Sequence, residues 1–100
     1  KPVRTGKRFW SGRVLKVDRF GNLITNLSFE EIPELAERPF QITVGLRTVD
    51  RMVNTFAEAP PGEPVLVPGS SGFLEIAMNQ KSAAEELRCT TGSPVELMIL

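Results

Sequence analysis

Val17-Asp-Arg-Phe-Gly-Asn-Leu-Ile-Thr-Asn26 is the stretch that most clearly indicates how this chain folds. Asp18 and Asn22 are residue types whose side chains bond their own backbone, and Gly21 readily adopts a positive φ, so a tight turn is predicted here. Residues 9–17 before the turn are rich in Trp, Val and Leu, and an apolar stretch follows it. Both flanks favour strands. We therefore predict a β-hairpin over residues 9–27.

The remainder of the chain repeats this pattern of short strands and turns. In the first strand we expect simple alternation, with Leu15 and Val17 on one face and Val14 and Lys16 on the other. Further strands are predicted at 41–44, 48–53, 65–67, 73–77 and 95–100. Capping-box patterns at 28–31 and 82–85 predict two brief helices. The fold class that follows is mainly all-β, a small antiparallel β-barrel with one or two short helices.

A second informative segment is Gly69-Ser-Ser-Gly-Phe-Leu-Glu-Ile-Ala-Met-Asn-Gln80, which also places glycines beside an apolar strand. The two segments contain polar residues that a plain barrel does not need. We interpret them as a binding surface shared between two turns; they are Asp18, Asn22, Asn26, Ser70 and Asn79.

Composition limits the possible functions. The 100 residues suit one domain of ordinary globular composition, with 41% hydrophobic and 24% charged residues. The net charge is zero, which removes the bulk electrostatic argument for nucleic acid as a partner, although residues 1–19 carry seven Lys or Arg against Asp18 alone. There is no histidine and a single cysteine, Cys89, which excludes histidine-dependent nucleophiles and the usual zinc ligand sets, so no metal site is expected. No stretch suggests membrane insertion or export, and we expect a cytoplasmic protein.

Several of these residues allow two interpretations. The Asp18 carboxylate can neutralise a cationic ligand or cap its own turn. The Asn22 amide can match the adenine edge or serve the turn. Phe20 and Phe56 can stack on a flat ring or plug the barrel. Ser70, with Ser71, can bind a carboxylate or sit in a flexible loop. Two further interpretations are structural: a solvated or ion-paired Glu75, and a solvated helix face formed by Glu30, Glu31, Glu34 and Glu37.

Taken together, the two segments resemble the C-terminal domain of the S-adenosylmethionine (SAM) hydroxide adenosyltransferases, relatives of the SAM-dependent chlorinases and fluorinases. The resemblance runs from about Phe9 to Leu100 and includes the stretches 55–57, 62–64 and 82–84. It implies a C-terminal β-barrel domain at 9–100 of a larger two-domain protein, preceded by a linker or extended arm at 1–8. The N-terminal catalytic domain would lie outside this chain.

The resemblance also implies an activity. Family members hydrolyse SAM with water, acting as hydroxide at the ribose C5′, to adenosine and L-methionine, and SAM is their substrate rather than a cofactor. They form homotrimers in which substrate binds between this barrel and the N-terminal domain of a neighbouring subunit. The activating groups lie on that N-terminal domain, so this chain alone is expected to be inactive and to hold no catalytic residue.

Individual roles follow from the same resemblance. Asp18 and Ser70 correspond to positions that hold the methionine end of the substrate. Phe20, Asn22 and Phe56 correspond to positions facing adenine, and Met78 and Gln80 lie in the stretch whose backbone meets the adenine edge.

Two departures bear on the nucleophile, and two alternatives stay open. Ser71 stands where the halogenases carry arginine, which favours the hydroxide-using branch over a SAM-dependent halogenase, and Ile24 stands where the fluorinase has tryptophan. The second alternative is a stand-alone β-barrel interaction module that binds protein or RNA through its basic N-terminal segment.

Overall fold

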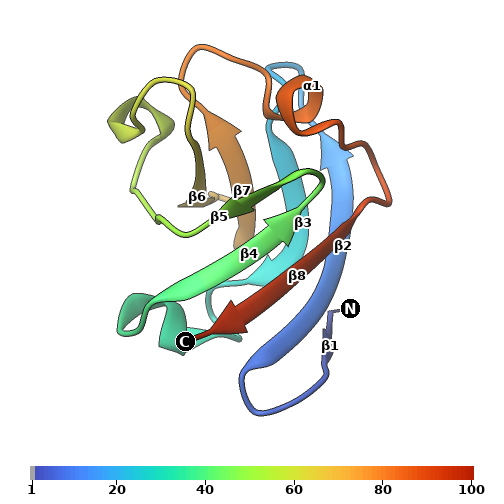
Figure 1. Cartoon of the computed structure of the whole chain (residues 1–100), viewed down its shortest axis with the longest axis vertical. Helices are drawn as coiled ribbons and strands as arrows, with labels where there is room; N and C mark the ends of the chain where they lie inside the picture. Colours follow the sequence, from blue (N-terminus) through green and yellow to red (C-terminus); the bar gives the residue numbers. More distant parts are fainter. Residues whose placement is uncertain (1) are drawn as a thin grey trace.

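A computed structural model describes residues 2–100 of the chain, apart from the side chain of Phe56. Antiparallel strands dominate it (Figure 1). The strands are β1 (Val3–Arg4), β2 (Phe9–Val17), β3 (Leu23–Ser28), β4 (Phe40–Val44), β5 (Arg47–Val49), β6 (Pro64–Pro68), β7 (Phe73–Met78) and β8 (Pro94–Ile99).

The strands form one sheet that curls into a nearly closed barrel. Neighbours follow the order β5-β4-β8-β2-β3-β7-β6, and β1 pairs with the first half of β2. The two ends of this order meet just after β5: Leu66 donates its N–H to the Arg51 carbonyl over 2.8 Å, and Val53 donates to the Leu66 carbonyl over 2.9 Å. Barrel closure leaves neither end of the sheet as a long free edge.

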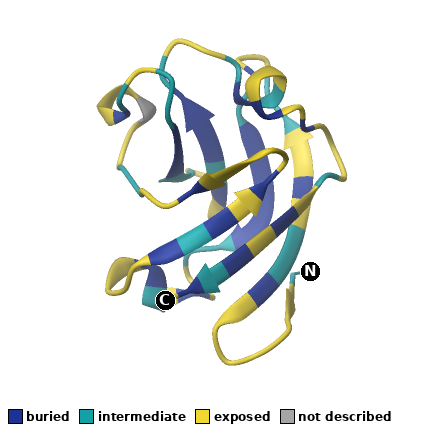
Figure 2. Ribbon diagram, in the orientation of Figure 1, coloured by how far each residue is buried: buried dark blue, intermediate teal, exposed yellow. Residues whose placement is uncertain are grey.

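The core follows from the two-residue period of the strands. Along β8, Val95, Leu97 and Ile99 point inward and are buried, while the residues between them are more accessible, an alternation visible in β4 and β8 in Figure 2. The first strand departs from the simple alternation predicted for it. The register shifts between Val14 and Lys16, so Val14 is buried and Val17 also packs against the core, whereas Leu15 is exposed. A β-bulge adds one residue and reverses the faces beyond it.

The helical segments are short. They comprise α1 (Ala83–Leu87) and the 3₁₀ helices η1 (Pro33–Ala36) and η2 (Phe56–Glu58). The predicted cap at Ser82 is confirmed, because its hydroxyl accepts from the Glu85 N–H over 3.1 Å. The brief helix expected near the 28–31 pattern is confirmed as η1, with Pro33 in its first turn, but its N-cap is Ile32 without a side-chain cap, so the capping box itself is wrong.

The mainly β, barrel-shaped fold predicted from the sequence is confirmed. The segment 1–8, expected to be a linker or extended arm, contains β1, which pairs Val3 with Ser11 and Arg4 with Trp10. The strand predicted at 48–53 is shorter than expected and ends at Val49, followed by a single bridge from Met52 to Leu66. Within residues 2–100, every helix falls short of the length and apolarity that a membrane span requires.

Candidate functional site

The turn between β2 and β3 is shaped by the carboxylate of Asp18. Its Oδ1 accepts hydrogen bonds from the backbone N–H groups of Phe20 and Asn22, both at 2.9 Å, and its Oδ2 accepts from the Asn22 side-chain amide at 3.0 Å. The Gly21 N–H donates to the Asp18 carbonyl over 3.0 Å. The sequence left two interpretations of Asp18 open, and the carboxylate does cap its turn; one lone-pair position on Oδ2 is not used by these contacts.

This turn packs directly on the start of α1, which follows closely after the second segment singled out in the sequence. The Gly21 carbonyl accepts from the Ala84 N–H over 2.9 Å. Gly21 has a φ of 84°, and a Cβ at this position would collide with the Ser82 side chain and lie 2.8 Å from the Ser82 Cα. Only glycine suits both the conformation and the close approach. The Asp18–Asn22 turn and the chain after β7 therefore act as one structural unit.

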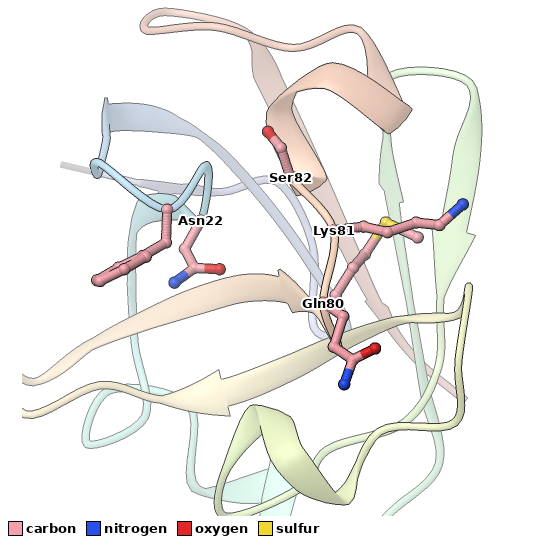
Figure 3. Close-up of a pocket in the computed structure, with 6 residues that line it drawn as sticks. Asn22, Gln80, Lys81 and Ser82 are labelled. Carbon is pink, nitrogen blue, oxygen red and sulfur yellow. The ribbon is translucent and has the colours of Figure 1, made fainter.

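A first surface hollow lies where these segments meet, and we call it the Phe20 hollow. It has a volume of about 290 Å³ and is lined by Phe20, Asn22, Met78, Gln80, Lys81 and Ser82. Figure 3 shows Asn22 facing the chain that runs from Gln80 to Ser82. The structure thus brings together four residues that the resemblance assigned to adenine.

The Phe20 hollow is bounded by the exposed ring of Phe20 and by the sharply turned backbone at Gln80. Phe20 is 67% exposed, and the Arg19 guanidinium carbon lies 4.9 Å from its ring centroid, so the ring is held on the surface instead of plugging the barrel. Gln80 has a φ of 61°, a left-handed conformation that is uncommon outside glycine and that turns the chain sharply after β7.

Two lining residues of this hollow were not predicted. Lys81 extends away from Asn22 in Figure 3, and its Nζ lies 3.8 Å from a Glu86 carboxylate oxygen. Ser82 was predicted only as a helix cap. It does cap α1, and it also lies directly against Gly21 of the Asp18–Asn22 turn. Because both residues directly follow Gln80 in the sequence, they could have been predicted to lie beside the same site.

A second hollow lies on the other side of Asp18, and we call it the Asp18 hollow. It has a volume of about 410 Å³, and its lining residues are Leu15, Lys16, Asp18, Ile24, Ser70, Ser71, Phe73 and Glu75. It contains both residues assigned to the methionine end of the substrate, Asp18 and Ser70. The apolar side chains of Leu15, Ile24 and Phe73 form its other walls. Asp18 lines this hollow, while its hydrogen-bond partner Asn22 lines the first.

Glu75 is a member of the Asp18 hollow that the sequence did not single out as a ligand-binding residue. It is half-buried on β7, and its pKa is raised, first by burial and then by the negative charge of Asp18, against a lowering by Lys16. We had expected Glu75 to be solvated or ion-paired. Among residues 2–100, its carboxylate makes no ion pair shorter than 4.0 Å.

The other polar residues of the predicted binding surface lie outside both hollows. Asn26 is buried, and its Oδ1 accepts from the Arg13 N–H over 2.9 Å, which satisfies the backbone near the β2 bulge. The Asn79 amide donates to the Ala59 carbonyl over 3.3 Å. Both side chains hold the barrel together. The side chain of Phe56, predicted to face adenine, lies outside the described residues.

The basic N-terminal segment has structural contacts of its own. The Arg4 guanidinium donates to the Gly6 and Lys7 carbonyls and lies 4.8 Å from the Trp10 ring centroid. These contacts hold the loop between β1 and β2, so Arg4 has a structural role in this segment. Cys89 is buried, and burial raises the pKa of its thiol, which makes it a poor nucleophile. No cluster within the described chain has the acidic and thiol groups needed to hold a metal ion.

Comparison with known proteins shows which family the chain belongs to. Residues 12–96 match the family model described as "SAM hydroxide adenosyltransferase C-terminal domain". Over 87 residues the chain is 44% identical to "(R)-S-adenosyl-L-methionine hydrolase" of Thermus thermophilus, covering 87% of this chain and 31% of that protein. The chain thus spans about a third of this relative.

Two solved structures share the fold. An uncharacterized conserved protein from Thermotoga maritima is 30% identical, with a TM-score of 0.81 over 98% of this chain and 38% of its own. A conserved hypothetical protein from Thermus thermophilus is 43% identical, with a TM-score of 0.69 over 90% of this chain and 34% of its own. The matched region contains both turns and both hollows. The chain belongs to the family of SAM hydroxide adenosyltransferase C-terminal domains.

Proposed function

We propose that this chain is the substrate-binding and trimer-interface domain of an S-adenosyl-L-methionine hydrolase, which converts SAM and water to adenosine and L-methionine. The observation that carries the proposal is the division of the two hollows by one turn. Phe20 and Asn22 line one hollow and Asp18 lines the other. A ligand with a flat base at one end and an amino acid at the other suits this arrangement.

Each end of SAM would meet suitable chemistry. In the Phe20 hollow, the exposed Phe20 ring offers a stacking surface, and the Asn22 side-chain carbonyl is not used by the bond that its amide makes to Asp18. Met78 and Gln80 would bound the adenine edge. In the Asp18 hollow, the Asp18 carboxylate would accept from the ammonium group, and the Ser70 hydroxyl would hold the amino-acid end.

The reaction would form a bond from the water oxygen to C5′ and break the C5′–S bond. The sulfonium sulfur would keep the electron pair and leave as the neutral thioether of methionine, while the water would lose a proton. The residues of this chain would bind and orient the two ends, which is a positioning contribution. The groups that activate water would come from the N-terminal domain of a neighbouring subunit in a homotrimer.

The proposal includes a domain assignment and a choice of nucleophile. Residues 9–100 would form the C-terminal barrel of a two-domain protein, in keeping with the 31% of the Thermus hydrolase that the chain spans. Ser71 at the rim of the Asp18 hollow leaves this region without the arginine expected of the halogenases. We therefore favour water over halide.

The direct test is chromatography of SAM after incubation with the full-length protein in chloride-containing buffer. Adenosine together with L-methionine is the expected result. A 5′-chlorinated nucleoside would support the halogenase alternative and overturn the choice of water. Absence of both products, with no binding of SAM by calorimetry, would contradict the proposed function and favour the interaction-module alternative.

The role of Asp18 is tested in the same protein. Asp18→Ala removes the proposed ammonium partner and is expected to weaken SAM binding at least about tenfold, the usual scale for a hydrogen bond to a charged group. Glu37→Gln, at an exposed site after η1, is the control for loss of one negative charge and is expected to bind SAM normally. Equal affinity in Asp18→Ala and the control would refute the assignment.

A further inference from the structure

We infer, resting on the proposed function, that Glu75 is a specificity-determining residue: it is a second carboxylate of the Asp18 hollow that selects ligands with a protonated amino group. The inference concerns a residue whose carboxylate forms no ion pair within residues 2–100. It rests on the hydrogen-bonding capacity of Asp18, on the placement of Glu75 and on the charge balance of the hollow.

Asp18 cannot satisfy an ammonium group alone. A protonated amine has three N–H donors, and each carboxylate oxygen has two lone pairs. The turn uses both acceptor positions of the Asp18 Oδ1 and one of Oδ2. One position therefore remains for a ligand. An amine desolvated against Leu15, Ile24 and Phe73 needs further acceptors, because an unpaired N–H in such a place is costly.

Glu75 is placed to supply them. On β7 it lies between Leu74 and Ile76, which point into the core and are fully buried, so its side chain points to the outer face. It pairs in register with Ile24, which pairs in turn with Lys16, so the three side chains form a row across the face that lines the hollow.

The neighbouring turn makes room for this carboxylate. A Cβ on Gly69 would collide with the Glu75 carboxylate, so the absence of a side chain at 69 allows Glu75 to lie against the Gly69–Gly72 turn, beside Ser70. Among residues 2–100 no hydrogen bond to this carboxylate is formed. Its acceptor positions are therefore open to a ligand.

The charge balance of the hollow favours a cation. Asp18 and Glu75 are two carboxylates against the single cation Lys16, and their mutual repulsion contributes to the raised pKa of Glu75. A bound ammonium group relieves this repulsion and can donate hydrogen bonds to both carboxylates. A ligand in which the amine is replaced by hydrogen leaves the repulsion in place. The hollow therefore binds the ligand with a protonated amine more tightly than the same ligand without it.

The test uses the full-length protein, saturated with adenosine, and calorimetric titration with L-methionine or with 4-(methylthio)butanoate, which lacks the amino group. Glu75→Gln, nearly isosteric and neutral, is expected to weaken L-methionine binding about tenfold and not to weaken 4-(methylthio)butanoate binding, because loss of a negative charge does not disfavour an anion. Glu37→Gln, with the same change of charge on an exposed site, is expected to leave both unchanged.

Each other outcome is decisive. Unchanged L-methionine affinity in Glu75→Gln would overturn the inference and leave the proposed function standing. An equal loss for both ligands, or dissociation of the oligomer, would also overturn it, because Glu75 would then act on the hollow or an interface as a whole. Failure of the unaltered protein to bind SAM or L-methionine would instead refute the proposed function. Should Glu75→Gln not fold, Glu75→Asp withdraws the charge by one methylene, and the same selective loss is expected.

Discussion

The two turns that line the Asp18 hollow are built in opposite ways. In the Asp18–Asn22 turn a side-chain carboxylate makes three hydrogen bonds within the turn, and Gly21 packs against Ser82. In the Gly69–Gly72 turn the bonds are between backbone groups, from Gly69 N–H to the Phe73 carbonyl at 3.0 Å and from Gly72 N–H to the Gly69 carbonyl at 3.1 Å. Ser70 and Ser71 are exposed.

The difference indicates that the two turns have different roles in the Asp18 hollow. The first turn is fixed by its own side chains and by α1, so it presents Phe20, Asn22 and Asp18 in set positions. In the second turn the hydroxyl-bearing residues Ser70 and Ser71 are exposed, and the backbone bonds lie at the base of the turn. A ligand that bridges the two turns would meet side chains already bonded within the first turn and exposed hydroxyl groups on the second.

The glycines test this comparison most strongly. Gly21 and Gly72 have similar φ values of 84° and 91°, but a Cβ meets Ser82 at the first and open space at the second. Gly72→Ala is expected to cost about 1 kcal/mol of unfolding free energy from backbone strain alone. Gly21→Ala is expected to cost about 3 kcal/mol or more, because strain and collision add. Urea unfolding measures both, and equal costs would mean that the first turn is not packed as described.

Removal of side chains gives the next largest effect. Asp18→Ala removes three hydrogen bonds and is expected to destabilise the chain by about 2 kcal/mol, whereas Ser70→Ala is expected to change stability by less than about 0.5 kcal/mol. Thermal unfolding of both variants is the measurement. A large loss in Ser70→Ala would show that the second turn is also held by its side chains.

The smallest expected effect is a pH-dependent change in the free energy of unfolding, which depends on Glu75 beside the second turn. The pKa of Glu75 is raised in the folded chain by burial and by Asp18, so ionisation of Glu75 disfavours folding. The associated stability is present below the unfolded pKa and is lost as pH rises through the folded pKa. Glu75→Gln is therefore expected to gain stability relative to the unaltered chain as the pH rises from about 4 to about 7. The gain is small because solvent screens the carboxylate, and a pH-independent difference would contradict the charge balance of the hollow.

The fold was largely predictable because strand periodicity and turn residues act locally. The hairpin over residues 9–27, the β-rich class and the Ser82 cap follow from neighbouring residues and are confirmed. The β2 bulge was not predictable, because it depends on pairing with β3 and on Asn26 bonding the Arg13 N–H. The end of β5 at Val49 likewise depends on barrel closure through Leu66.

The candidate site was predictable in part. Phe20, Asn22, Met78 and Gln80 gather in one hollow, and Asp18 and Ser70 in another, as the resemblance grouped them. Asn26 and Asn79 were misjudged, because a polar residue on a strand looks the same in sequence whether it faces a ligand or an unpaired backbone group. Glu75 was interpreted as solvated or ion-paired, since the position of its carboxylate in the Asp18 hollow, without an ion pair among residues 2–100, depends on three-dimensional neighbours.

The place of β8 in the sheet has a consequence for synthesis on the ribosome. This strand lies between β4 and β2, and it pairs Trp10 with Leu97 and Ile42 with Leu97. Until β8 has left the exit tunnel, the strand that joins β4 to β2 is missing, and the two halves of the sheet can meet through the bonds of Leu66 to Arg51 and Val53. The earlier strands must wait with their apolar faces uncovered, and such long-range pairing is slow to form. Nascent chains of this domain are thus expected to need protection by chaperones until β8 has emerged.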